Sequence, residues 1–165
     1  MTELRIRQAV RALLVTPDQS VLLVRFEFAT ATVWALPGGG LEPGEDHLTA
    51  LRRELIEEVG LHDVAIGAHV WTREHVIPFE DGRWDGQRDV VHVVPTERFE
   101  PQPALSWDQL RAERLHEIRW WTVDEIEAVS ADPAAAIGFA PRRLAELLRL
   151  LERDGIPESP FSSGI

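Results

Sequence analysis

Residues 46–59 carry four charged side chains at spacings that a helix would bring to one side. Each helical residue turns its side chain by about 100°, so with Arg53 at zero, Glu57 falls at about 40° and Glu54 at about 100°. Glu58 follows at about 140°. The apolar side chains occupy the adjoining arc between about 160° and 240°, namely Leu48, Leu51, Leu55 and Val59. The spacing therefore predicts three carboxylates on one face, beside the core.

A charged helical face is most often simply solvated, and that is the ordinary alternative here. Energetics argue against it, because like charges three or four residues apart cost a few tenths of a kcal/mol each, roughly. Glu57 and Glu58 also lie in the last turn, where the helix dipole favours cations. A bound divalent cation would offset this repulsion. Oxygen ligands in a chain without cysteine suit Mg²⁺ or Mn²⁺ better than zinc.

The segment before this helix contains Pro37 followed by three glycines, Gly38, Gly39 and Gly40. Neither a helix nor a strand tolerates this composition well in its interior, so the glycines predict a loop. Glycines let the backbone approach an ion or a phosphate closely, and magnesium also prefers phosphate ligands. Loop and helix together predict one phosphate-handling site.

The segment GGLEPGEDHLTALRRELIEEVGL, residues 39–61, resembles a complete Nudix box. Every fixed position of that pattern is filled, by Gly39, Glu45, Arg53, Glu54, Leu55, Glu57, Glu58, Gly60 and Leu61. A motif with this many fixed positions is far more specific than a lone glycine loop. The flanking sequences LLVRFE, WALPGGG and EIRWWTVDEI also look like those of bacterial Nudix proteins, so the resemblance spans most of the chain.

The resemblance implies an α+β fold, a Nudix-like α/β/α sandwich with a central mixed sheet. It also implies hydrolysis of a nucleoside diphosphate linked to another group, with Mg²⁺ or Mn²⁺ as cofactor. The implied site residues are Glu54, Glu57 and Glu58 as metal ligands, Arg53 as the residue that orients them, Glu45 as a support and the Gly38 carbonyl as a further ligand. The ions would neutralise phosphate charge and activate water for attack on phosphorus.

The resemblance leaves the proton acceptor open. Glu57, Glu58 or an acid on a later loop are all compatible with it. Glu113, ahead of the EIRWW segment, is the leading later candidate and Glu117 the second. A solvated loop acid is the ordinary alternative for both.

Several side chains are candidates for substrate contacts. Trp34 could stack on a base, although a large aromatic at a strand end is more often core. Arginine forks suit phosphates, which points to a hairpin after the helix with Arg73, Arg83, Gln87 and Arg88. Solvation is the alternative for each of these. Pro78 lies roughly where ADP-ribose pyrophosphatases carry a proline, but this resemblance is weak, because a proline at a strand end ordinarily just stops the strand. The substrate could be a nucleotide sugar, an ADP-ribose-like compound or a non-standard nucleoside triphosphate.

Apolar runs and turn residues predict the elements that position these groups. Residues 7–15 and 21–28 read as a β-hairpin, and 33–36 as a short extended piece. Residues 46–59 form a helix that ends at Gly60, a good left-handed cap. Residues 64–77 and 88–99 read as a second, long hairpin.

The remaining third of the chain predicts a short strand at 118–121 and a helix opened by a capping box of Thr122 and Glu125. Trp120 and Trp121 should point to opposite faces. A last helix should begin at Pro141 and end at Gly155. Residues 1–155 are expected to form one domain, with little order in a tail at 156–165.

Composition excludes several classes of function. The sequence has no cysteine, so it has no disulfide, thiolate metal site or cysteine nucleophile. All 17 basic residues are arginine, which excludes lysine chemistry. The net charge of −11 disfavours nucleic acid and anionic membranes as partners. With no apolar run long enough to span a bilayer, a cytoplasmic protein is expected. Its partner would be a small nucleotide diphosphate, and a homodimer is compatible with the family.

One alternative belongs to a different class of function. The resemblance also admits a nucleotide-sensing binding domain without turnover, as in transcriptional regulators of the family. The intact set of acids and the absence of a basic DNA-binding face disfavour this alternative.

Overall fold

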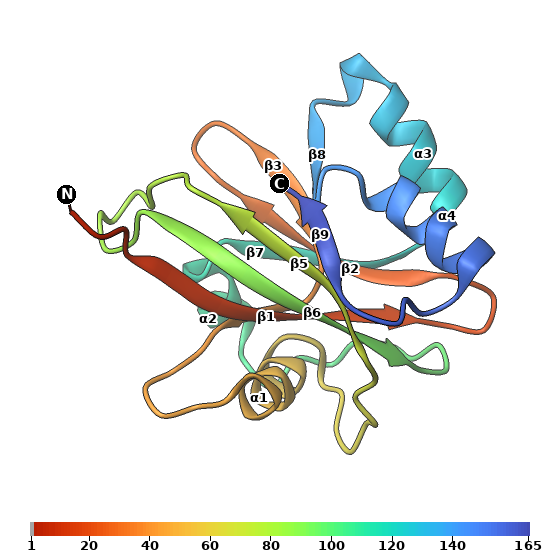
Figure 1. Ribbon diagram of the computed structural model, residues 1–165, viewed down its shortest axis with the longest axis horizontal. Coiled ribbons are helices and arrows are strands. Elements are labelled where there is room, and N and C mark those ends of the chain that lie inside the picture. Colours follow the sequence, from red (N-terminus) through yellow and green to blue (C-terminus); the bar gives the residue numbers. More distant parts are fainter. Residues whose placement is uncertain (1) are drawn as a thin grey trace.

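The structure is a computed structural model that describes residues 2–165 (Figure 1). Its strands, in chain order, are β1 (Ile6–Val15), β2 (Val21–Glu27), β3 (Thr32–Ala35), β4 (Gly38–Gly40), β5 (His69–His75), β6 (Gly86–Pro95), β7 (Leu115–Trp121), β8 (Ile137–Ala140) and β9 (Phe161–Gly164). Its helices are α1 (His47–Val59), α2 (Trp107–Ala112), α3 (Val123–Ala131) and α4 (Leu144–Asp154), with a 3₁₀ turn at Pro133–Ala135. No helix within residues 2–165 combines the length and apolar character needed to cross a bilayer.

The strands form one mixed sheet in the order β8-β3-β2-β1-β6-β5-β9, with β4 paired to β1 and β7 to β2. The two expected strands at the start of the chain are present, but the expected hairpin is nearly absent. β1 and β2 pair only at Val15 with Val21. The glycines of β4 pair with Ala9–Arg11 of β1. The sheet therefore opens into two halves, and a pocket lies at the divergence.

The glycines expected to form a loop are instead the short strand β4, antiparallel to β1. Glycine is unfavourable inside a strand unless another chain segment must approach it closely. Here β1 lies beside it and α1 packs against it. The close approach explains why glycines form a strand at this position.

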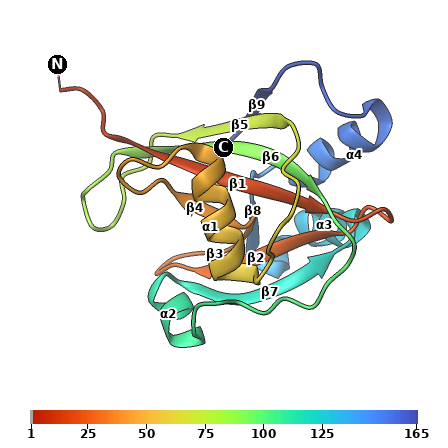
Figure 2. The same cartoon turned by 90° about the horizontal axis from the view of Figure 1, so that it is seen from below.

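Helices cover both faces of the sheet, as the expected α/β/α sandwich requires. α1 crosses one face of the sheet, and α3 and α4 lie on the opposite side (Figure 2). Two hydrophobic cores result, one with leucines of α1 and one with leucines of α4. Trp121 is buried in the second core and Trp120 packs on the first, which confirms that they face opposite sides.

The main helix agrees closely with its prediction. The Asp46 side chain accepts a hydrogen bond from the Thr49 N–H at its start, and Gly60 ends it in a left-handed conformation. Leu51, Leu55 and Val59 are buried, but Leu48 is 46% exposed because it lies in the first turn, beyond the edge of the core. The Thr122–Glu125 capping box of α3 is also present.

The C-terminal part differs more from its prediction. The last helix begins at Leu144 rather than at Pro141, and it ends at Gly155 as expected. Within the tail at 156–165, residues Phe161–Gly164 form β9, which pairs in parallel with β5. The long hairpin is present as β5 and β6, both shorter than expected, while β7 begins earlier at Leu115. Sequence periodicity missed α2 and β8, since each is only four to six residues long.

Candidate active site

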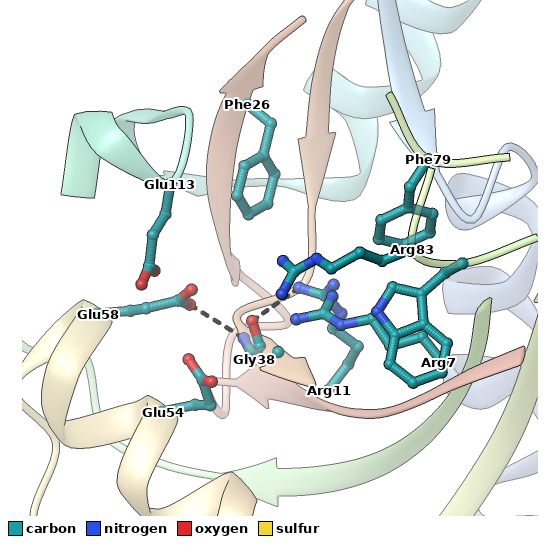
Figure 3. Close-up of a pocket in the computed structure, with 11 residues that line it drawn as sticks. Arg7, Arg11, Phe26, Gly38, Glu54, Glu58, Phe79, Arg83 and Glu113 are labelled. Carbon is teal, nitrogen blue, oxygen red and sulfur yellow. Dashed lines mark hydrogen bonds between the residues drawn. The ribbon is translucent and has the colours of Figure 1, made fainter. Parts of the chain in front are cut away.

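A pocket of about 350 Å³ opens where the two halves of the sheet diverge (Figure 3). Its lining comes from β1, β2, β4, α1, the β5–β6 loop and the end of α2, through Arg7, Arg11, Phe26, Gly38, Gly39, Glu54, Glu58, Phe79, Arg83, Trp84 and Glu113. The carboxylates of Glu54, Glu58 and Glu113 lie on one side, which we call the acid wall. Guanidinium groups of Arg7, Arg11 and Arg83 lie on the other, which we call the basic wall.

Glu54 and Glu58 are one helical turn apart on α1 and only 7% and 3% exposed. The Gly38 N–H donates to the Glu58 carboxylate at 3.0 Å, which fixes its orientation. Burial raises the pKa of Glu58 to about 8, and the charge of Glu54 adds to the rise. Burial also raises the pKa of Glu54, although Arg53 opposes it. The acid wall therefore holds buried negative charge that the protein compensates only in part.

Arg53 is the centre of the carboxylate cluster beside the pocket. Its guanidinium donates to Glu45 at 2.9 Å, to Glu54 at 2.9 Å and to Glu57 at 3.1 Å. It also donates to the Gly40 carbonyl at 3.1 Å, which ties α1 to β4. The hydrogen bond from Arg53 lowers the pKa of Glu45. These contacts are those of a residue that orients carboxylates.

Two glycines of β4 leave room for one side chain from each wall. A Cβ atom at Gly39 would lie 2.5 Å from a carboxylate oxygen of Glu54. A Cβ atom at Gly40 would lie 2.4 Å from a guanidinium nitrogen of Arg7. Contacts below 3.0 Å force a displacement, so glycine at these positions lets both side chains lie against the strand.

The donor set of the acid wall fits a hard divalent cation. Two buried carboxylates whose pKa values are raised chiefly by burial present oxygen atoms only, and a cation between them would offset their negative charge. Across residues 2–165, no three His, Cys, Asp or Glu side chains are already arranged to hold a metal. Glu57, the third expected ligand, is paired with Arg53. The Gly38 carbonyl accepts a hydrogen bond from Arg11 at 2.8 Å.

The basic wall rests on a buried network that sequence reasoning did not find. Asp89 is bound by Arg11 and by Arg73, each at 3.1 Å. Burial would raise the pKa of Asp89, but the two arginine charges outweigh it and hold that pKa below its usual value. Gln87 donates to Asp89 at 2.8 Å and accepts from Arg7 at 2.9 Å. β1 and β6 place Arg7 beside Gln87 in register, a pairing no local pattern reveals.

Of the other side chains expected at the site, some line the pocket and others do not. Glu113 lines the pocket at the end of α2, whereas Glu117 is on β7 and pairs with Arg25. Glu113 also contributes to the raised pKa of Glu58. Arg83, on the β5–β6 loop, lines the pocket together with Phe79 and Trp84, two aromatics that sequence reasoning missed. Of the two later acids that the sequence offered, Glu113 lies at the pocket and Glu117 does not.

Four of the expected substrate residues lie outside the pocket lining. Trp34 is 2% exposed and packs edge to face on Trp121, so it belongs to the core, the alternative that the sequence left open. Arg88 is exposed on β6, with Glu74 at 3.9 Å. Arg73 and Gln87 are in the network beneath the basic wall rather than on its surface.

A comparison with protein families shows to which family the chain belongs. The family model described as "NUDIX domain" matches residues 5–142, which include both walls of the pocket. The chain belongs to the Nudix family. The match confirms the resemblance drawn from residues 39–61.

Similar proteins agree with this membership. The Nudix chain is 28% identical over 118 residues to the nucleoside triphosphatase NudI of Enterobacter sp. (strain 638), covering 67% of this chain and 77% of the relative. The solution structure of the E. coli ORF135 protein matches with a TM-score of 0.63 and 22% identity, covering 94% of this chain and 96% of that one. The NUDIX domain of Shewanella oneidensis NrtR, complexed with ADP ribose, matches with a TM-score of 0.62 and 17% identity, covering 92% and 89%. The two structures support the Nudix fold, and the family match with the named triphosphatase supports the predicted class of Nudix pyrophosphohydrolase.

Proposed function

We propose that this Nudix protein hydrolyses a diphosphate linkage in a nucleoside diphosphate derivative, with Mg²⁺ or Mn²⁺ bound at the acid wall. The observation that carries the proposal is the pair of buried carboxylates, Glu54 and Glu58, facing arginines across one pocket. A nucleoside triphosphate is the leading substrate class, because the NudI relative is named a nucleoside triphosphatase. An ADP-ribose-like compound or a nucleotide sugar is the second class.

Glu54, Glu57 and Glu58 would hold the ion, with the Gly38 carbonyl as a further ligand. When bound, the ion would neutralise phosphate charge and lower the pKa of a coordinated water. Arg53 keeps the carboxylates oriented through its hydrogen bonds to Glu45, Glu54 and Glu57. The chain's own contribution is thus a rigid set of oxygen atoms on one helix.

In the reaction, a water oxygen forms a bond to phosphorus and the bond from phosphorus to the bridging oxygen breaks, leaving its electron pair on the departing phosphate. The proton of the water goes to a carboxylate. Glu113 is our candidate for that acceptor, since it reaches into the pocket from the end of α2 and faces Glu58. Glu57 and Glu58 remain alternatives, because a metal ligand can also accept the proton.

The test is hydrolysis of a nucleotide panel by the purified protein with Mg²⁺, with Mn²⁺ and with a chelator. The panel contains nucleoside triphosphates, including 8-oxo-dGTP, together with ADP-ribose and a nucleotide sugar. We expect turnover that requires the metal and is nearly abolished in Glu57→Gln. Glu152→Gln, an exposed glutamate of α4 paired with Arg149, is the matched control and should retain activity.

Two outcomes would contradict the proposal. Glu57→Gln with wild-type turnover at saturating magnesium would remove Glu57 from the site. Nucleotide binding without hydrolysis of any panel member would instead favour a nucleotide-sensing domain.

A further inference from the structure

The arginines of the basic wall differ in how their charge is compensated. Arg11 is paired with Asp89, and Arg83 is paired with Asp81. Among the described residues, no carboxylate lies within ion-pair distance of Arg7. Arg7 is partly buried, and it faces the pocket (Figure 3). A partly buried cation without a counter-ion indicates a place for an anion.

The Arg7 guanidinium is nevertheless held firmly by neutral contacts. One terminal nitrogen donates to the Gln87 carbonyl oxygen at 2.9 Å. The Cζ atom of Arg7 lies over the Phe79 ring, 5.7 Å from its centre, and the missing side chain at Gly40 provides space for the guanidinium. Its Nε and its other terminal nitrogen donate no hydrogen bond to the described residues. Two fixed donors are therefore free for a ligand.

Gln87 is only 5% exposed, and its own orientation is determined by Asp89. Because its amide N–H donates to Asp89 at 2.8 Å, its carbonyl oxygen must point to Arg7. Asp89 simultaneously fixes Arg11. Two arginines on the same face of β1 are thus oriented by one buried pair on β6.

On the β1–β6 side of the pocket, positive charges outnumber negative ones. Arg7, Arg11 and Arg73 bring three positive charges near the single carboxylate of Asp89, while Glu54 and Glu58 lie on the acid wall. Burial lowers the pKa of Arg7 and the neighbouring charge of Arg11 lowers it further, and together they outweigh the opposing charges of Glu54 and Asp89. An anion at the pocket side of Arg7 would relieve this repulsion.

We propose that Arg7 and Arg11 form an anion site for a substrate phosphate that is not held at the acid wall, with Gln87 and Asp89 as positioning residues. Arg7 then makes the enzyme prefer substrates that carry a further phosphate, nucleoside triphosphates, over nucleotide sugars that end in a neutral group. This preference rests on the proposed function, whereas the anion site itself can be tested without turnover.

The first experiment measures binding of inorganic pyrophosphate to the chelator-treated protein by calorimetry. We expect the wild type to bind and Arg7→Gln to bind about 10- to 100-fold more weakly, since it loses charge-assisted hydrogen bonds. Arg98→Gln makes the same charge change on an exposed residue beyond the far end of β6 and should bind like the wild type. Equal binding by Arg7→Gln and wild type, or no binding by the wild type, overturns the anion site.

The second experiment compares kcat/KM for a nucleoside triphosphate and for a nucleotide sugar. Arg7→Gln should lower the value for the triphosphate by about 10- to 100-fold and that for the nucleotide sugar by less than about 3-fold. Gln87→Met should raise KM for the triphosphate while leaving kcat nearly unchanged, and Arg7→Lys should restore part of the loss. Equal losses on both substrates overturn the proposed preference. If the wild type hydrolyses neither substrate, the proposed function fails, and pyrophosphate binding still decides the anion site.

Discussion

The acid wall comes mostly from one helix, whereas the basic wall depends on strands distant in sequence. Glu54 and Glu58 are neighbours on α1, while Arg7 is positioned by Gln87, which is 80 residues away. The two walls also differ in how their charge is compensated. Glu58 is buried beside a like charge, whereas Arg11 has a buried counter-ion in Asp89. The acid wall should therefore cost stability in the metal-free protein, and the network under the basic wall should contribute to it.

The largest expected effect is at the acid wall, where one substitution should lower activity and raise the stability of the metal-free protein. Glu58→Gln should lower kcat by about 10²- to 10⁴-fold, since a buried carboxylate of the site is lost. In chelator, the same variant should have a free energy of unfolding about 1 to 3 kcal/mol higher, because glutamine still accepts from the Gly38 N–H and needs neither a buried charge nor a proton taken up on folding. Turnover assays and urea unfolding measure the two effects. Lower stability of the variant would contradict the contrast between the walls.

The second effect concerns the network under the basic wall. Asp89→Asn should lower the free energy of unfolding by about 3 to 5 kcal/mol, because two buried arginines lose their counter-ion. Asp85→Asn is the matched control, since Asp85 pairs with the exposed Arg5 and should cost less than about 1 kcal/mol. Urea unfolding of both variants gives the difference, and similar costs for the two would show that Asp89 is not a buried counter-ion of consequence.

The third effect is the pH dependence of stability in the metal-free protein. Glu58 keeps its proton up to about pH 8 in the folded state, whereas in the unfolded chain it ionises near pH 4.5. The folded state binds more protons between these values, so its stability should fall as the pH rises through this window. Asp89 acts below it, since its lowered pKa removes stability only in acid.

Urea unfolding in chelator at several pH values measures this dependence. His69 and His75, whose pKa values burial lowers, act in the opposite direction. They are present in both proteins, so the difference between wild type and Glu58→Gln isolates Glu58. An equal slope in the two proteins would remove Glu58 as its source.

The smallest effects come from adding one methyl group beside each wall. Gly40→Ala would displace the flexible end of Arg7 and should weaken pyrophosphate binding by about 3- to 10-fold, at a stability cost below about 1 kcal/mol. Gly39→Ala would displace the Glu54 carboxylate instead and should weaken Mn²⁺ binding while leaving pyrophosphate binding unchanged. Calorimetry with each ion separates the two variants. The same loss of both ions in both variants would mean that the walls are not independent.

The sequence predicted most reliably what depends on local spacing. Residues 46–60 contain the leucine stripe, the carboxylates and the stop signal at Gly60, and α1 agrees with them closely. Glu54 and Glu58 could be placed on one face because a helix has a fixed period. The same local logic found the capping box of α3.

What sequence reasoning missed depends on pairing between distant strands. No pattern around Arg7 or Gln87 shows that β1 and β6 run in parallel with these residues in register. Asp89 reads as an ordinary strand acid until Arg11 and Arg73 are brought to it. Gly38–Gly40 form a strand because β1 lies beside them, a neighbour that the local sequence does not reveal.

The last strand, β9, covers one edge of the sheet, far from the pocket. β9 pairs with the outer edge of β5, and Ser163 there is almost fully buried. Without β9, β5 would present a row of unpaired N–H and C=O groups, a template on which strands of other molecules can add. Shortening the chain after Gly155 would therefore promote self-association into aggregates, even though every side chain of the pocket would still be present.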